Sequence, residues 1–301
     1  MKKLCFPATS RVHLARQKLL LEELKKYFEV DIFQPTTKNE GGMSAFSILI
    51  AIEFNNFLLR KSYDCVLIRG DRYEMLGLTM ICAYKGIKIV HIEGGDLSGA
   101  IDNKIRYAIT SLSDYHFCTN EESHKRLITG GISPDKVWNF GSLDVELAKT
   151  IEPKKIKNKP YLLVVFHPIE NENQDEVIEA ISQFPSYEVV TTSSNKDYKK
   201  GYGKEEYSEE DYINLIRYAS CCVGNSSSFL KEASILGVPV VNVGNRQNKR
   251  LKPKNVLDVP CESEKIRLAI EFQIQNKYEP DNIYYKPDTS IQIAKKLQEI
   301  L

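Results

Sequence analysis

The chain has 301 residues, a length that exceeds one ordinary small core and suits two domains. Its 41 lysines and arginines balance 40 acidic residues, so composition provides no general attraction to nucleic acid or to an anionic membrane. The seven cysteines include no CxxC pair, which argues against a disulfide framework or a zinc site and favours a reducing cytoplasm. No apolar run approaches the roughly 20 residues that cross a bilayer, and the apolar run near the start is too short for a signal peptide.

In the first half of the chain, short apolar runs alternate with longer helical patterns. We expect strands at residues 2–8, 29–34, 63–70, 87–94, 115–119 and 136–141. We expect helices between them at residues 15–28, 44–61, 73–86, 101–113 and 120–131. Near-continuous apolar strands in this alternation predict a parallel sheet that helices cover on both faces.

A basic, proline-containing stretch at residues 149–160 reads as a linker, after which the same alternation starts again. We therefore expect two Rossmann-like, doubly wound α/β domains, residues 1–150 and 151–301. The apolar spacing of the last helical run, residues 290–301, suits packing on a neighbouring surface, such as the first domain. Two such domains side by side would leave a cleft at the carboxyl ends of their strands, where ligands of open α/β sheets bind.

Charged residues follow three of the strands expected in the first domain. Ser10 and Arg11 follow the first strand, Asp71 and Arg72 follow the strand "VLIRG", and Glu93 follows "IKIVHI". Because parallel strands end at the same edge of a sheet, these side chains are candidates for one site. Glu93 precedes Gly94 and Gly95, which would allow a ligand to approach the backbone closely.

Asp102 begins the helical run that follows this glycine-containing loop, where helix amides favour a carboxylate. A role confined to the helix start is the alternative for Asp102. An ion pair in a surface turn is the alternative for Asp71 and Arg72.

In the second domain, "CCVGNSSSFLKEASILG" places a strand, a polar turn and a helix in succession. Helix-start amides with the hydroxyls of Ser226 and Ser227 would form an anion cradle, although a helix cap at Ser227 or Ser228 is the alternative. Arg246 follows the strand "VPVVNVG" and could meet a phosphate or remain solvated in a basic loop. His167 ends the strand "YLLVVFHP", at the edge where a ligand would lie.

Several long motifs resemble the hydrolysing UDP-N-acetylglucosamine 2-epimerases of nonulosonic and sialic acid biosynthesis. They are "RGDRYE", "HIEGGDLSGAIDNKIRYAITSLSDYHF", "FHP" and "VGNSSSFLKEASILGVPVVNVGNRQ", in the family's order. The resemblance implies a GT-B-like fold with the active site in the cleft, a nucleotide-sugar substrate, no metal or other cofactor, and a homo-oligomer, a dimer or tetramer. The residues that match family positions are Asp71, Glu93, Asp102 and His167 as catalytic residues and Ser226, Ser227, Glu232 and Arg246 as nucleotide-binding residues. Arg11 falls near the family's N-terminal arginine and is a candidate for substrate binding. Arg72, next to Asp71, is a further candidate for substrate binding.

Family chemistry explains three clustered carboxylates. Removal of the C2 proton accompanies anti elimination of UDP to a glycal, and water then adds to leave free N-acetylmannosamine. Acid–base groups must take and return protons, and nearby charges can tune their proton affinity.

The chain departs from the family at "RVHL", where a "RADY"-like run is usual, and in two compact stretches, 33–44 and 192–207. A diacetamido-trideoxy sugar or GDP thus stays open, as do a GT-B glycosyltransferase and a non-catalytic nucleotide-sugar-binding protein.

Overall fold

A computed structural model describes residues 1–38, 42–99, 102–167, 169, 172–192 and 207–301. The chain divides into two compact units. The first contains residues 1–97, 101–146 and 286–301, and the second contains residues 98–100 and 147–285. Most of the compact stretch 192–207 and residues 39–41 of the other lie outside the described residues.

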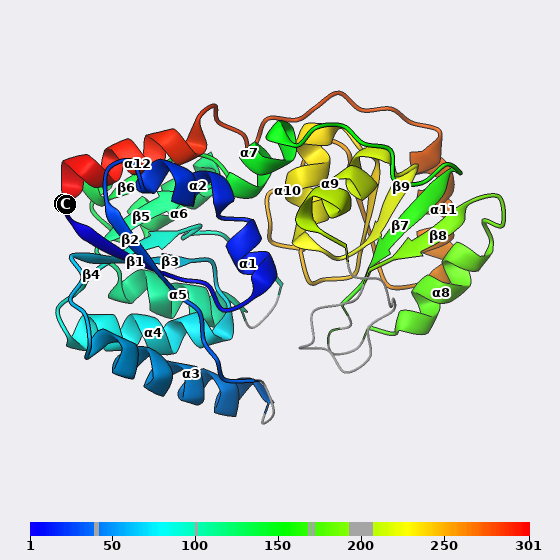
Figure 1. Ribbon diagram of the computed structural model, residues 1–301. Helices are drawn as coiled ribbons and strands as arrows, with labels where there is room; N and C mark the ends of the chain where they lie inside the picture. The colour runs from blue at the N-terminus through cyan, green and yellow to red at the C-terminus, as the bar shows by residue number, and fades with distance from the viewer. Residues whose placement is uncertain (39–41, 100–101, 168, 170–171, 193–206) are drawn as a thin grey trace. The chain divides into compact units, whose positions relative to one another are not determined.

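The first unit is built on a six-stranded parallel sheet in the order β2-β1-β3-β4-β5-β6 (Figure 1). Its strands are β1 Lys3–Pro7, β2 Glu29–Phe33, β3 Cys65–Arg69, β4 Lys88–Ile92, β5 Tyr115–Cys118 and β6 Val137–Asn139. Side chains along β3 alternate between two hydrophobic cores: Cys65 and Leu67 lie in one, Val66 and Ile68 in the other. The strand is therefore buried on both faces, as its unbroken apolar sequence predicts.

Helices cover both faces of this sheet. They are α1 Arg11–Ala15, α2 Lys18–Leu24, α3 Gly42–Leu58, α4 Tyr73–Tyr84, α5 Asp102–Leu112, α6 Glu121–Thr129 and α12 Thr289–Ile300, with a 3-10 turn at Pro134–Lys136. Helices α3 and α4 pack together on one face, and α12 packs beside α2 on the other (Figure 1). Ile293 and Leu297 of α12 join the same core as Leu4 and Leu20, so the end of the chain completes the first unit.

The second unit contains a five-stranded parallel sheet in the order β11-β10-β9-β7-β8. Its strands are β7 Tyr161–Val165, β8 Glu188–Thr191, β9 Cys221–Gly224, β10 Val240–Val243 and β11 Val256–Val259. Its helices are α8 Gln174–Ser182, α9 Glu209–Tyr218, α10 Ser227–Leu236 and α11 Ser263–Ile274. One core contains side chains of α8 and α11, and the other those of α9 and α10, so this sheet is also covered on both faces.

Three regions differ from the sequence-based expectation. The single helix expected at residues 15–28 is two helices, α1 and α2, because Ser10 caps an earlier start and the chain turns at Arg16 and Gln17. Helix α7, Leu143–Thr150, occupies the start of the expected linker, since Leu143, Val145 and Ala148 are buried. Strand β11 and helix α11 were not expected; β11 is short and only half-buried, so its apolar pattern is weak.

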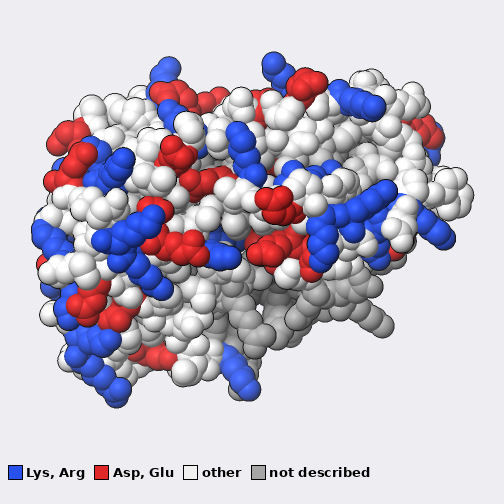
Figure 2. Space-filling model, turned by 45° about the horizontal axis from the view of Figure 1, so that its top comes forward, with Lys and Arg blue, Asp and Glu red and all other residues white. Residues whose placement is uncertain are grey.

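The chemistry of the surface and of the cysteines agrees with the composition. Basic and acidic side chains are interspersed on the face seen in Figure 2. All seven cysteines carry free thiols, and all except Cys261 are buried. Within the described residues, no helix has the length and apolar character of a membrane span.

Candidate active site

Three neighbouring strands of the first unit end beside one another. Strand β3 pairs with β1 on one side and with β4 on the other, and Arg69 lies opposite Ile92 in the register. The residues after β3 and β4, from Asp71 and from Glu93, therefore begin at adjacent points of the sheet edge. The sequence-based prediction that these strand ends converge is confirmed.

Glu93 stands at the tip of β4 in a left-handed backbone conformation, with φ of 71°. Its amide donates to Phe117 O at 2.8 Å, and its carboxylate accepts two hydrogen bonds from Arg69. Gly95 follows with φ of 81°, and a Cβ there would lie 2.5 Å from Ser123 O. The glycine is needed for this close approach between the loop and α6.

Asp71 is held by a buried arginine of α5. Arg106 forms an ion pair with the Asp71 carboxylate and donates to Asp96 O at 2.9 Å and Asn103 Oδ1 at 2.8 Å. One guanidinium thus orders Asp71, the loop after Glu93 and the first turn of α5. The carboxylate of Asp71 keeps about a quarter of its surface exposed and can still meet a ligand.

The remaining predicted residues of the first unit have different positions. Asp102 is the first residue of α5, as the sequence predicts, and is half-buried. Arg72 donates from Nε to the fully buried carboxylate of Glu74 at 2.5 Å and lies 5.8 Å from the Tyr73 ring. Arg11 is the first residue of α1, and its side chain lies outside the described residues. Asp71 and Glu93 therefore follow adjacent strands of one sheet edge, and Asp102 begins the helix whose Arg106 pairs with Asp71.

In the second unit, Asn225 links three strand ends. Gly224 has φ of 136°, and a Cβ there would lie 2.1 Å from Val165 O, so only glycine permits β9 to pass β7 this closely. Asn225 is fully buried; its amide side chain accepts from His167 N at 2.8 Å and donates to His167 O at 2.9 Å. Its carbonyl accepts from Arg246 and from Gln247, both at 2.9 Å.

Replacement of Asn225 by alanine tests this link. It would leave the buried backbone groups of His167 without their partners, so we expect a loss of about 2–4 kcal/mol in the free energy of unfolding. Urea denaturation measures it. Asn245→Ala, a change of an exposed side chain in the loop after β10, is the control and should cost less than about 0.5 kcal/mol. Equal urea midpoints for Asn225→Ala and the parent protein would contradict the assignment.

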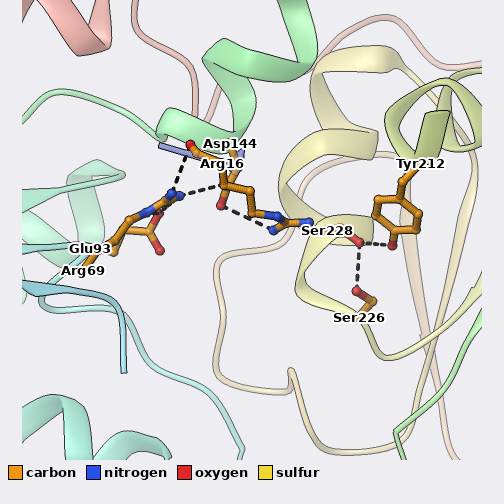
Figure 3. A network of polar contacts seen from close by, with 7 residues as sticks. All are labelled: Arg16, Arg69, Glu93, Asp144, Tyr212, Ser226 and Ser228. Atoms are coloured by element: carbon orange, nitrogen blue, oxygen red, sulfur yellow. Dashed lines mark hydrogen bonds and ion pairs between the residues drawn. The ribbon is translucent and has the colours of Figure 1, made fainter. Parts of the chain in front are cut away.

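The serines lie at the start of α10. Ser226 is the N-cap residue, yet its hydroxyl pairs with Ser228 Oγ at 2.8 Å instead of capping the helix amides (Figure 3). Ser228 Oγ in turn contacts the Tyr212 hydroxyl at 2.7 Å (Figure 3). Ser227 begins the helix and is half-buried, and Glu232 lies buried further along it. The helix start therefore offers amides and hydroxyls to an anion.

His167 is a buried, neutral imidazole. Burial, and secondarily the positive charge of Arg246, lowers the pKa of His167 to about 4. At neutral pH this side chain can exchange hydrogen bonds but carries no charge. Arg246 is half-buried, donates to Asn225 O and so is linked to His167 through two hydrogen bonds; it brings a positive charge to this edge.

Network residues that were not among the sequence candidates include Arg69, Arg106 and Asn225, and also Asp144, whose carboxylate lies 2.7 Å from Arg69. Arg69 and Asn225 directly end or follow a buried strand, which is a usable signal in the sequence. Arg106 has a similar signal, a charge on the apolar side of a helix. Asp144 lies in the first turn of α7, where no element was expected, and no local pattern marks it.

Two doubly wound parallel sheets, each with polar side chains at its carboxyl edge, define a two-domain α/β protein of the GT-B-like class. The solved structure of UDP-N-acetylglucosamine 2-epimerase from Neisseria meningitidis bound to UDP-GlcNAc has the same fold. Its TM-score is 0.81 at 17% identity, over 99% of this chain and 100% of that one.

The family profile described as UDP-N-acetylglucosamine 2-epimerase matches residues 12–298. The chain belongs to this family. It is 31% identical to the polysialic acid biosynthesis protein P7 of Escherichia coli, over 90% of this chain and 79% of that protein. It is 30% identical to the GDP/UDP-N,N'-diacetylbacillosamine 2-epimerase (hydrolyzing) of Campylobacter jejuni, over 65% of this chain and 60% of that protein.

Proposed function

We propose that the protein is a hydrolysing nucleotide-sugar 2-epimerase. It would convert UDP-N-acetylglucosamine, or a close analogue, to UDP and the free sugar with the opposite configuration at C2. From UDP-N-acetylglucosamine, this free sugar is N-acetylmannosamine. The observation that carries the proposal is that Asp71 and Glu93 follow adjacent strands of the first sheet, and that Arg106 joins Asp71 to the first turn of α5, the helix that Asp102 begins. Relatives named for polysialic acid biosynthesis and for a hydrolysing epimerase support the same choice.

The proposed reaction has two steps, an elimination and a hydration. A carboxylate takes the C2 proton while the C–H electron pair forms a C1–C2 double bond and the C1–O bond to UDP breaks. Water then adds across the glycal, its oxygen to C1, and a proton returns to C2 from the opposite face. Asp71, Glu93 and Asp102 share this proton transfer, and neutral His167 contributes hydrogen bonds.

The leaving diphosphate would be bound by the second unit. Helix α10 presents its first amides together with the hydroxyls of Ser226 and Ser227, an arrangement that favours phosphate. Arg246, which donates to Asn225 O, adds a positive charge. Glu232 is a further proposed contact, to the nucleoside. Arg11 and Arg72 are further proposed contacts to the substrate.

A cytoplasmic location suits this activity, and the seven free thiols support it, because a reducing compartment preserves them. A diacetamido-trideoxy sugar or a GDP-linked sugar is the alternative substrate, because the departures from the family pattern at "RVHL" and in residues 33–44 and 192–207 fall where a sugar or base could bind.

The experiment is incubation of the protein with UDP-N-acetylglucosamine alone, followed by NMR of the sugars. Release of UDP and free N-acetylmannosamine is the expected result. Formation of UDP-N-acetylmannosamine would instead indicate the non-hydrolysing reaction. No conversion, together with tight binding of UDP, would favour a glycosyltransferase, a nucleotide-sugar-binding protein or a different sugar. Parallel incubations with UDP- and GDP-linked diacetamido-trideoxy sugars identify the last case.

We also propose a homo-oligomer, with a second copy of the chain seated on α3 and α4. Apolar side chains are exposed on the outer sides of these helices: Ile48, Leu49, Ile52, Met80 and Tyr84. Glu53 is the only charged residue of α3, and it bonds to Thr36 and Thr37 of its own chain. An apolar face without charges is complementary to itself, which an isologous interface requires.

Light scattering after size exclusion tests this interface. We expect a mass of at least twice the 34.4 kDa of one chain, and a single-chain mass for the variant Ile48→Lys/Ile52→Lys. Both substituted residues are exposed, so the variant should keep its fold. A parent protein of 34.4 kDa would contradict the proposal.

A further inference from the structure

Glu93 occupies a backbone conformation that a non-glycine residue rarely adopts. Only Glu93 and Asp288, among the described non-glycine residues, have positive φ. Such a conformation persists when neighbouring groups hold it. The amide of Glu93 is fixed to Phe117 O, but the direction of its carboxylate must come from side-chain contacts.

Arg69 supplies those contacts. It is the last residue of β3, its side chain is 5% exposed, and its Nε and Nη2 both donate to Glu93 Oε1, at 3.0 and 2.6 Å (Figure 3). Two charge-assisted hydrogen bonds from one planar guanidinium fix the position of this oxygen, and so fix the direction of the Glu93 carboxylate.

A second carboxylate shares the same guanidinium. Nη2 of Arg69 lies 2.7 Å from Asp144 Oδ1, and Nη1 donates to Arg16 O at 3.3 Å (Figure 3). Asp144 also lies 3.8 Å from Arg16 Nη1. A half-buried carboxylate, Glu93, and a buried one, Asp144, are therefore bridged by one buried cation, and the position of each depends on it.

We propose that Arg69 is a positioning residue for the reaction, which rests on the proposed function: it directs the Glu93 carboxylate and keeps it ionised, with Asp144 as the opposing charge. Loss of the cation would leave the carboxylates of Glu93 and Asp144 close together without it, and their repulsion would make Glu93 hold a proton to higher pH. Loss of Asp144 would have the opposite effect, because Arg69 would then serve Glu93 alone.

Other charged and titratable groups surround this pair. They come from α1, from the residues after α1 and β3, from β4 and from α7: His13, Arg16, Arg72, His91 and Asp144. Burial lowers the pKa of His13 to about 3 and that of His91 to about 4, so both stay neutral where the enzyme would work. Of these groups, Asp144 shares the Arg69 guanidinium with Glu93, so we expect its removal to change the titration of Glu93.

The test compares Arg69→Lys, Arg69→Met and Asp144→Asn. Arg69→Lys keeps the charge but loses the two-pronged contact, so we expect kcat to fall about 10- to 100-fold, with UDP affinity within about twofold of wild type. The acidic limb of the kcat/KM profile should move up by about one pH unit or more in Arg69→Met and move down in Asp144→Asn. Opposite shifts distinguish positioning from a merely structural role.

A second readout does not depend on turnover. In protein labelled with carbon-13 glutamate, the Glu93 carboxyl resonance is the one missing from Glu93→Gln. It should titrate at higher pH in Arg69→Met and at lower pH in Asp144→Asn than in wild type. If Arg69→Met does not fold, the kcat of Arg69→Lys and the titration of Glu93 in Asp144→Asn test the proposal. An unmoved resonance, or an unmoved acidic limb in active variants, overturns the inference. A wild-type protein that converts neither UDP-N-acetylglucosamine nor the UDP- and GDP-linked diacetamido-trideoxy sugars refutes the proposed function, and the resonance alone then tests the role of Arg69.

Discussion

Glu93→Gln is expected to lower the turnover of UDP-N-acetylglucosamine by about two to four orders of magnitude. Glutamine has nearly the shape of glutamate, so it can keep the left-handed backbone of this position, and its side-chain oxygen can still accept from Arg69. The variant therefore removes the negative charge that would accept the proton, and keeps the backbone conformation and the hydrogen bond from Arg69. UDP affinity, measured by calorimetry, should stay within about twofold, because the proposed phosphate contacts lie in the second unit.

The matched control is Glu22→Gln, the same chemical change at an exposed position of α2. It should alter neither turnover nor melting temperature. Full activity in Glu93→Gln would remove Glu93 from the proposed proton transfer. A parallel loss of activity and of folded protein would mean that the charge of Glu93 serves stability, since Arg69 and Asp144 would then be left without their third partner.

The strands at the centre of each sheet were predictable because they are buried on both faces. The runs around β3, β4 and β7 are almost entirely apolar. A central strand of a parallel sheet buries the side chains of such a run on both faces. The turn at Gln17 had no comparable signal. Gln17 is fully buried, although a glutamine usually lies on the surface of a helix. Tertiary packing, and not the helix propensity of the local sequence, therefore sets the break between α1 and α2.

The candidate site was predictable only where residues directly follow strands. Asp71 and Glu93 follow adjacent strands, so the topology of a parallel sheet brings them together. Their partners could not be predicted in this way. Arg106 reaches Asp71 from α5, and Asp144 reaches Arg69 from α7, and both contacts join segments far apart in the sequence. Such pairs depend on how helices pack on the sheet, which periodicity alone leaves open.

The free energy of unfolding should fall steeply as the pH is lowered from about 6.5 toward 4. Four histidines are neutral: His91, His116 and His167 are buried, and His13 is half-buried. Burial lowers the pKa of His13 and His116 to about 3, and that of His91 and His167 to about 4. In the unfolded chain a histidine binds its proton near pH 6.5. Between these values the unfolded state binds more protons, so protons favour unfolding, and the stability is fully present only above about pH 6.5.

Each such histidine contributes at most about 1.4 kcal/mol per pH unit within this window. Urea denaturation between pH 5 and 8 measures the slope, and His116→Phe should reduce it by about one quarter, because one of the four titrating groups is gone. Val90→Ala, a change in the apolar core of the same sheet, should lower stability at every pH and keep the slope. A free energy of unfolding that stays constant from pH 7 to 5 would mean that these imidazoles accept protons in the folded protein, and His167 would then be a charged group at the carboxyl edge of the second sheet.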